Sequence, residues 1–243
     1  MSAVQHTGRS RASLDESIER LRTDLRRLAS LVDMAIDRSV ASLARLDERA
    51  ARQVIADDAA VNKLRYSIEQ DAVHLIATQQ PIASDLRFII AVLAVVSELE
   101  RIGDYCVGIG KIVLLHEGRP LLKPLVDIPR MAALVRQGLR ASLDALITKN
   151  EFLARAIASQ DDEIDRLYDQ IYRELLTYML NDPSTIDRAT WLLWAAHNLE
   201  RMGDRIQNIC ERAVYEVTGK VVEFSGTPPT SEADRKTATD FSA

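Results

Sequence analysis

The chain has 243 residues, with 31 basic and 36 acidic side chains and a formal net charge of −5. This mildly acidic balance argues against a general nucleic-acid-binding protein, which needs a basic surface. Apolar residues make up 47% of the chain and aromatic residues only 5%, a composition typical of helices rather than sheets. We therefore expect an all-α protein with a sizeable apolar core.

Membrane-spanning and secretory segments are not predicted. The longest uninterrupted apolar run, residues 88–96, is well short of the roughly 20 residues that cross a bilayer. Residues 1–12 have no apolar stretch of the kind found in a signal peptide. Cys106 and Cys210 form no CxxC or Cys/His cluster, which is typical of reduced thiols in an intracellular protein. We expect a cytoplasmic protein.

The first half of the chain predicts three long helices. Residues 1–12 have no periodicity and are predicted to be a disordered leader. From Ser13, a suitable N-cap, apolar residues recur every three or four positions up to residue 46. A second helix is expected from 47 to 78, and the Gln79-Gln80-Pro81 break separates it from a third over 82–115. Short connections between long helices predict an antiparallel three-helix bundle over residues 13–116.

The pattern then repeats after a linker. Residues 117–129 contain Gly118 and three prolines and are predicted to connect the two halves. Further helices are expected over 129–148, 151–180 and 184–217, giving a second three-helix bundle over residues 130–220. Residues 221–243 are rich in Ser, Thr, Pro and Asp and are predicted to be a disordered tail.

A pentapeptide occurs twice, 100 residues apart, as Glu-Arg-Ile-Gly-Asp at 100–104 and Glu-Arg-Met-Gly-Asp at 200–204. Such a repeat indicates a duplicated unit. Carboxylates at i and i+4 of a helix repel one another, and an interior glycine costs about 1 kcal/mol relative to alanine. Acidic pairs supply hard oxygen ligands, so Glu100, Asp104, Glu200 and Asp204 are candidate metal ligands. Alternatively, the arginines screen a polar stripe and the glycines allow close helix packing.

The helix before each pentapeptide also carries a polar i,i+4 pair. Asp58 and Asn62 in the first half match Asp161 and Asp165 in the second at an offset of 103. A metal site needs ligands from facing helices, so these four residues complete the candidate set. The alternative is that they are ordinary surface side chains, which are often acidic.

Longer segments carry a family resemblance. The segments are 77–87 (Ala-Thr-Gln-Gln-Pro-Ile-Ala-Ser-Asp-Leu-Arg), 173–179 (Arg-Glu-Leu-Leu-Thr-Tyr-Met), the two pentapeptides with their preceding leucines, and 208–211 (Asn-Ile-Cys-Glu). Together they resemble the PhoU family of phosphate-uptake regulators, over residues 14–220 in a consistent order.

This resemblance implies two tandem, similar three-helix bundles packed side by side, and a homodimer. It implies a negative regulator of high-affinity phosphate uptake and phosphate-regulon signalling. Such a protein is a cytoplasmic adaptor between the phosphate ABC transporter and a sensor histidine kinase, and it reaches the membrane only through these partners. Family members bind multinuclear iron or zinc through Glu/Asp-x-x-x-Asp motifs, which here are Glu100/Asp104 and Glu200/Asp204, with Asp58, Asn62, Asp161 and Asp165 at the matching positions of the preceding helices.

The two halves differ in ways that bear on a site. Gly108 in the first half stands where the second half has Asn208. If this segment shapes a metal site, the first site binds metal less well than the second. Trp191 and Trp194 replace alanines of the first half and are expected in the core or in a dimer contact.

No enzyme activity is predicted, because His74, His116 and His197 lack a paired nucleophile. Three alternatives remain open. A ferritin-like di-metal oxidoreductase would place histidine three residues after each ligand Glu, where this chain has Gly103 and Gly203. A metal-free helical scaffold and an accessory protein to another phosphate carrier are the other two.

Overall fold

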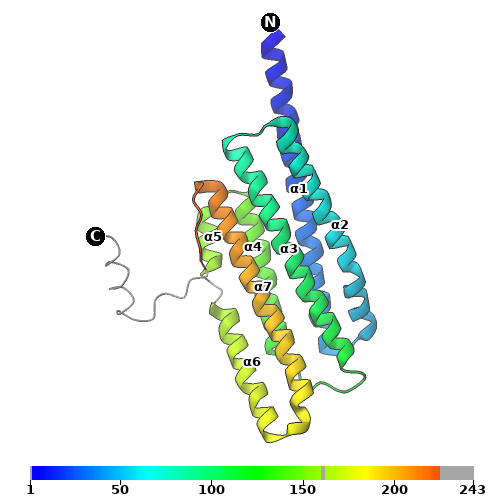
Figure 1. The fold of residues 1–243 in the computed structure, drawn as a ribbon. Coiled ribbons are helices and arrows are strands. Elements are labelled where there is room, and N and C mark those ends of the chain that lie inside the picture. The colour runs from blue at the N-terminus through cyan, green and yellow to red at the C-terminus, as the bar shows by residue number, and fades with distance from the viewer. Residues whose placement is uncertain (1, 160–161, 225–243) are drawn as a thin grey trace, which may run out of the picture.

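The computed structural model describes residues 2–159 and 162–224 (Figure 1). Within these ranges it has no β-strand, which confirms the all-α prediction. Its elements are α1 (Ser2–Arg45), α2 (Glu48–Gln79), α3 (Ala83–Leu115), α4 (Asp127–Ile147), α5 (Glu151–Ala158), α6 (Asp162–Asn181), the short 3₁₀ helix η1 (Pro183–Thr185) and α7 (Ile186–Thr218).

Helices α1–α3 form one bundle and α4–α7 a second, and the two lie side by side as predicted (Figure 1). The halves meet along two seams, where α3 packs against α7 and α1 packs against α4. In Figure 1, α3 and α7 run antiparallel through the middle of the molecule. The pentapeptides of both halves therefore lie on its two central helices.

Burial follows the apolar pattern of each helix. On α1 the buried residues form one stripe, because this helix covers the outside of its bundle. On α3, by contrast, apolar side chains between Phe88 and Val113 are buried on most sides, since this helix contacts α1, α2 and α7. None of the helices in the described ranges combines the length and apolar character needed to cross a membrane.

Three element boundaries differ from prediction. Helix α1 begins at Ser2, so the segment predicted as a disordered leader is helical; extending a formed helix adds hydrogen bonds without needing apolar residues. The helix predicted over 151–180 is two helices, and Ser159 closes α5 through its backbone bond to Arg155. Serine competes with helical backbone bonding, which favours an end at this point. Helix α4 begins inside the predicted linker, at Asp127.

Residues 221–224 of the predicted tail are described, and part of this segment packs against the second bundle. The side chains of Val222 and Phe224 pack against the core, and the Phe224 backbone N–H donates to Glu211 Oε1 at 2.9 Å. Residues 225–243 lie outside the described part of the chain.

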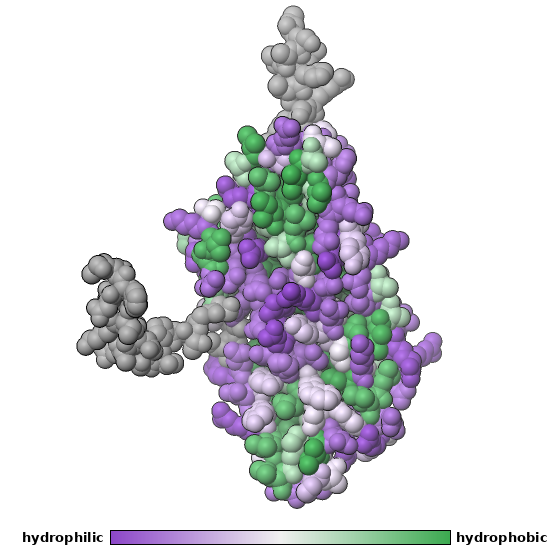
Figure 2. Space-filling view, in the orientation of Figure 1, coloured by the Kyte–Doolittle hydropathy of each residue, from purple (hydrophilic) through white to green (hydrophobic). Residues whose placement is uncertain are grey.

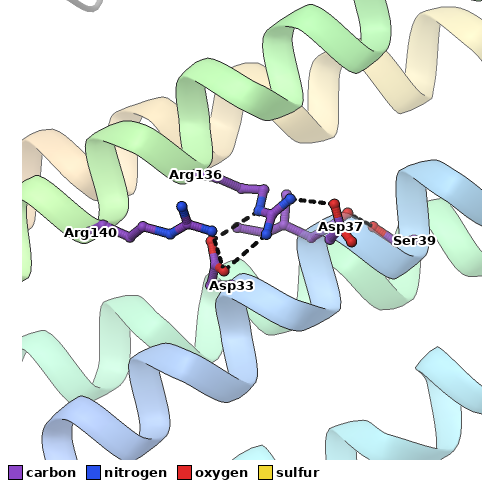
Figure 3. A network of polar contacts seen from close by, with 6 residues as sticks. Asp33, Asp37, Ser39, Arg136 and Arg140 are labelled. Atoms are coloured by element: carbon purple, nitrogen blue, oxygen red, sulfur yellow. Dashed lines mark hydrogen bonds and ion pairs between the residues drawn. The ribbon is translucent and has the colours of Figure 1, made fainter.

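The α1–α4 seam is held by a charge network (Figure 3). Asp33 accepts hydrogen bonds from Arg136 Nε at 3.0 Å and from Arg140 Nη2 at 2.8 Å, and Arg136 also bonds Asp37. Burial alone would raise the pKa of Asp33, but the two arginines outweigh it and the pKa is lowered. At the offset of 103, Asp33 matches Arg136 and Asp37 matches Arg140. The duplicated positions therefore carry opposite charges, which attract across the seam.

Candidate functional site

The first acidic face is formed by α2 and α3. One turn of α2 separates Asp58 from Asn62, whose Nδ2 donates to Asp58 Oδ2 at 2.7 Å. Burial and the nearby charge of Asp104 on α3 both raise the pKa of Asp58. Asp58 of one predicted pair and Asp104 of the other therefore lie within electrostatic range of each other, although they belong to different helices. Glu100 lies on α3 one turn before Asp104.

Gly103 lets the two helices bring these groups together. A Cβ atom at position 103 would lie 3.2 Å from Asp58 Oδ1 and 3.5 Å from Val61 Cγ1. Asp58 Oδ1 is buried and accepts no hydrogen bond from any described residue. The glycine therefore makes room for a carboxylate oxygen that lacks a partner.

Sequence reasoning missed Arg65, which contacts the first face. Arg65 Nη1 donates to Glu100 Oε1 at 3.0 Å, and its Nε donates to Glu69 Oε1 at 2.9 Å. This arginine bridges α2 and α3 beside the candidate ligand. The sequence offers one signal for this residue, which is a difference between the two halves. Position 65 is arginine, whereas its match at the offset of 103 is Tyr168.

The second acidic face is centred on Glu200 of α7. Its Oε2 atom is buried without a hydrogen bond from the described residues, although His197 Nδ1 lies 3.3 Å away. Burial, Asp204 and Asp165 raise the pKa of Glu200, and His197 opposes them. Asp165 is exposed on α6, and the fourth predicted residue, Asp161, lies outside the described residues.

Asp204 has arginine neighbours on its own helix. Arg201 Nη1 lies 3.4 Å from Asp204 Oδ2 and Arg205 Nη2 lies 3.8 Å from it. The Arg201–Asp204 pair is well exposed to solvent, so its energy is small.

Each half also has a cavity that reaches the glycine of its pentapeptide. The first, of about 300 Å³, is lined by Asp58, Val61 and Gly103 among others. The second, of about 330 Å³, is lined by Ile164 and Gly203, which match Val61 and Gly103. Both halves therefore have a hollow at the pentapeptide glycine, but of the candidate ligands only Asp58 lines one of them.

The described acidic side chains do not by themselves form a metal site. In the part of the chain whose side chains are described, no three His, Cys, Asp or Glu residues converge closely enough to hold a metal ion. Each face nevertheless has one buried carboxylate oxygen that accepts no hydrogen bond, Asp58 Oδ1 and Glu200 Oε2, although the second lies 3.3 Å from His197 Nδ1. A cation would satisfy such an oxygen, and carboxylate oxygens are suitable ligands, so the donor chemistry suits a metal although the described side chains do not converge on one point.

The predicted effect of the Gly108/Asn208 difference on metal binding stays a prediction, but the structure shows what these two positions contact. Asn208 Nδ2 donates to Glu98 Oε2 at 3.2 Å across the α3–α7 seam, next to Arg205. A Cβ atom at position 108 would lie 3.1 Å from Asn198 Nδ2. These positions therefore shape the contact between the bundles.

The two tryptophans occupy different environments. Trp191 is buried against His116, with ring centroids 4.9 Å apart, and Arg119 lies over its ring. Trp191 is therefore a core residue, as expected for one of the pair. Trp194 is 50% exposed, so its predicted role in a dimer contact stays a prediction.

A protein-family model and named relatives both match this chain over most of its length. Residues 25–113 and 128–213 each match the sequence profile of the PhoU domain. The chain is 39% identical over 218 residues to the "phosphate-specific transport system accessory protein PhoU homolog" of Caulobacter vibrioides, covering 89% of this chain and 94% of that protein. Its counterpart in Clostridium acetobutylicum is 34% identical over 217 residues, covering 89% and 99%.

Two solved structures have the same fold. The phosphate transport system regulatory protein PhoU from Streptococcus pneumoniae superposes with a TM-score of 0.80 at 32% identity, covering 86% of this chain and 99% of that one. PhoU from Pseudomonas aeruginosa superposes with a TM-score of 0.80 at 33% identity, covering 85% and 99%.

Proposed function

Because the chain belongs to the PhoU family, we propose that it regulates phosphate-specific transport as an accessory protein. The observation that carries this proposal is the match of both repeats to relatives along nearly their full length. Those relatives are named accessory proteins, and the streptococcal structure is titled a regulatory protein. These names favour regulation over the ferritin-like oxidoreductase alternative.

The regulation proposed is negative, and it works through protein contacts. In this proposal the protein is a cytoplasmic homodimer that connects the phosphate ABC transporter to a sensor histidine kinase and reaches the membrane only through them. Long helices joined along two seams give an extended surface, and the face in Figure 2 is hydrophilic with apolar patches, which suits protein contacts. The His116 ring packs against Trp191 at a tilt of 58°, and burial lowers the pKa of His116, which suits a structural role rather than proton transfer.

Metal at the acidic faces is the second part of the proposal. Iron or zinc ions, in a multinuclear cluster, would neutralise the carboxylates and fix the shape of each face. The buried oxygens of Asp58 and Glu200 that accept no hydrogen bond support this assignment. The residues that would hold the ions are Asp58, Asn62, Glu100 and Asp104 in the first half, and Asp161, Asp165, Glu200 and Asp204 in the second.

The regulatory proposal is tested by phosphate uptake. Cells lacking the protein should continue high-affinity uptake of radiolabelled phosphate when phosphate is plentiful, and the wild-type gene should restore repression. Unchanged uptake in the deletion strain would contradict negative regulation. If deletion of the protein still raises phosphate uptake in a strain that lacks the ABC transporter, the protein serves another phosphate carrier instead.

The metal proposal is tested by elemental analysis. Changing Glu100, Asp104, Glu200 and Asp204 together to alanine should remove bound iron or zinc from the purified protein and weaken repression of uptake. Equal metal content in wild type and variant would show that these residues are not ligands. Full repression by the metal-free variant would favour the metal-free scaffold.

A further inference from the structure

An exposed apolar surface lies on the hairpin that α6 and α7 form. Its side chains are between 40% and 76% exposed to solvent. In Figure 2 hydrophobic side chains gather at the lower end of the molecule, where Figure 1 places this hairpin. We call it the hairpin surface, and it consists of Tyr172, Leu176 and Leu180 on α6 and of Ile186 and Trp194 on α7.

These five side chains form two adjacent rows. The ring centroids of Tyr168 on α6 and His197 on α7 lie 6.0 Å apart, so the two helices are neighbours at this level. Steps of three or four residues keep to one side of a helix, and from this contact they lead along both helices toward the turn at η1. On α6 the steps reach Tyr172, Leu176 and Leu180, and on α7 they reach Trp194, Thr190 and Ile186. The rows therefore make one continuous surface.

The first half lacks the two aromatic side chains at the matching positions. At the offset of 103, Tyr172 matches Glu69, which accepts a hydrogen bond from Arg65 Nε at 2.9 Å. At the offset of 100, Trp194 matches Ala94. The first bundle thus forms with a charged pair and a methyl group where the second has exposed aromatic rings. Packing of the bundle therefore does not explain why the rings are there.

The size and composition of the hairpin surface suit a protein interface. At roughly 200 Å² for each fully exposed side chain, the exposed fractions correspond to on the order of 500 Å² of surface. A stable interface of standard size covers about 800 Å² on each partner, and somewhat more than half of that area is apolar. The hairpin surface therefore supplies the apolar part of one such interface. Tryptophan and tyrosine are also the residue types that most often dominate binding energy.

Charges of both signs lie around the hairpin surface. Asp169 lies 3.7 Å from Arg173 on α6, and Asp187 of α7 lies 3.7 Å from Arg119. All four side chains are exposed, so these pairs exchange partners at little cost. Anionic lipid surfaces and nucleic acids attract basic surfaces, and this mixed rim favours neither. Under a two-fold rotation, a rim with both signs can place the acids of one copy next to the bases of another.

We propose that a second copy of this chain binds the hairpin surface, so that two α6–α7 hairpins pack as a four-helix bundle about a two-fold axis. Such a contact uses the same surface on both copies and closes at the dimer. Within the described residues the first half lacks the aromatic pair, so each chain offers one such surface. This inference rests on the proposed homodimer, and it adds which residues make the contact.

The test is the monomer–dimer equilibrium of the full-length protein, measured by sedimentation velocity over a range of concentrations. Trp194→Ala and Tyr172→Glu each install the residue that the first half has at the matching position. Because both copies lose the side chain, each variant should raise the dimer dissociation constant at least about 100-fold.

Matched controls come from the first half. Val73 matches Leu176 at the offset of 103, and Val73 and Tyr66 are both more than half exposed on α2. Val73→Glu and Tyr66→Glu should therefore dimerise like wild type. A loss of dimer in these controls as large as in Trp194→Ala would overturn the assignment to the hairpin surface.

Acrylamide quenching of tryptophan fluorescence gives a second measurement that needs no variant, so it holds even if a substitution impairs folding. Trp194 is half exposed, whereas Trp191 is buried. Quenching should fall as the wild-type protein is concentrated through the dimer dissociation constant, because the second copy covers Trp194. Quenching that stays constant while the dimer forms would contradict the inference.

The outcomes distinguish this inference from the function on which it rests. A wild-type protein that stays monomeric would overturn both the inference and the proposed homodimer. A wild-type dimer that persists unchanged in Trp194→Ala and Tyr172→Glu would overturn the inference and leave the homodimer standing. Binding to phosphatidylglycerol vesicles that is lost in Trp194→Ala would assign the surface to lipid instead. Loss of uptake repression in a Trp194→Ala protein that still dimerises would assign it to a different protein.

Discussion

At the scale of single residues, two glycines of α3 face α2 with different neighbours. A Cβ atom at position 103 would meet side-chain atoms of Asp58 and Val61. A Cβ atom at position 110 would meet the backbone oxygen of Ala51 and Cγ1 of Ile55, both at 3.2 Å. Side-chain ends can rotate away from a new methyl group, whereas the backbone of a packed helix cannot. The two positions should therefore respond differently to the same substitution.

Gly110→Ala should destabilise the protein by about 1 kcal/mol, because overpacking outweighs the gain in helix propensity. Gly103→Ala should change the free energy of unfolding by less than about 1 kcal/mol, because the propensity gain offsets the shift of Asp58. Urea unfolding followed by circular dichroism measures both. A larger loss in Gly103→Ala than in Gly110→Ala would contradict this account.

A buried glutamate outside the acidic faces gives a pH-dependent prediction. Glu216 of α7 has a fully buried side chain, and Lys149 Nζ lies 3.3 Å from its Oε1. Burial raises the pKa of Glu216 above 4.5, with Lys149, Arg22 and Arg87 opposing it in part. The folded state then binds the proton more tightly than the unfolded state. The stability contributed by Glu216 is complete below pH 4.5 and is lost as the pH rises through the folded pKa.

Glutamine at position 216 resembles the protonated side chain, so Glu216→Gln should remove the loss of stability that occurs as the pH rises. We expect the free energy of unfolding at pH 7 to rise by about 1 kcal/mol and to be unchanged near pH 4. Urea midpoints measured across this pH range are the test. Lower stability of the variant at pH 7 would mean that attraction to Lys149 exceeds the cost of burial.

At the scale of elements, the pairing of α1 with α4 depends on opposite charges at matched positions. Arg136 donates two hydrogen bonds to Asp33, whose side chain is only 15% exposed. Because the pKa of Asp33 is lowered, the contribution of the ion pair is complete above the unfolded pKa and is lost as the pH falls. The seam should therefore weaken in acid.

Charge exchange across this seam tests the pairing. Asp33→Arg alone and Arg136→Asp alone should each cost about 2 kcal/mol at neutral pH, between the values for exposed and buried pairs. The double variant restores opposite charges and should recover most of the loss. Additive losses in the double-mutant cycle would show that Asp33 and Arg136 do not interact.

At the scale of the whole molecule, the two bundles share a buried surface. Helices α3 and α7 each bury residues on most of their sides, and the seam between them is as extensive as the contacts within a bundle. Separating the bundles would expose this apolar surface to water. The halves should therefore unfold together.

The position of the tryptophans allows a direct test, since Trp191 and Trp194 are the only two in the chain and both lie in the second bundle. Gly110→Ala alters the first bundle. Its thermal midpoint should fall by about 2–4 °C for 1 kcal/mol, equally by tryptophan fluorescence and by circular dichroism. An unchanged fluorescence midpoint would show that the bundles unfold independently.

The duplication, the positions of the acidic pairs and most of the helices can be predicted from the sequence, whereas the division of the expected 151–180 helix into α5 and α6 was not predicted. Periodicity of 3.6 residues is a local property, and it placed both pentapeptides on long helices without reference to packing. The longer motifs carried the family resemblance, and that resemblance implied the side-by-side packing of the bundles. Helix boundaries are predicted less well, because α1 extends to Ser2 through residues that have no apolar periodicity.

Only the tertiary structure decided what touches the acidic pairs. Arg65 reaches Glu100 across 35 positions, and Asp33 reaches Arg136 across 103, so no local pattern reveals either contact. The same holds for Asn208, which lies one turn beyond Asp204 but contacts Glu98 of the other bundle. Ion pairs depend on which helix sides meet in space, and that is fixed by the burial of apolar surface over the whole chain.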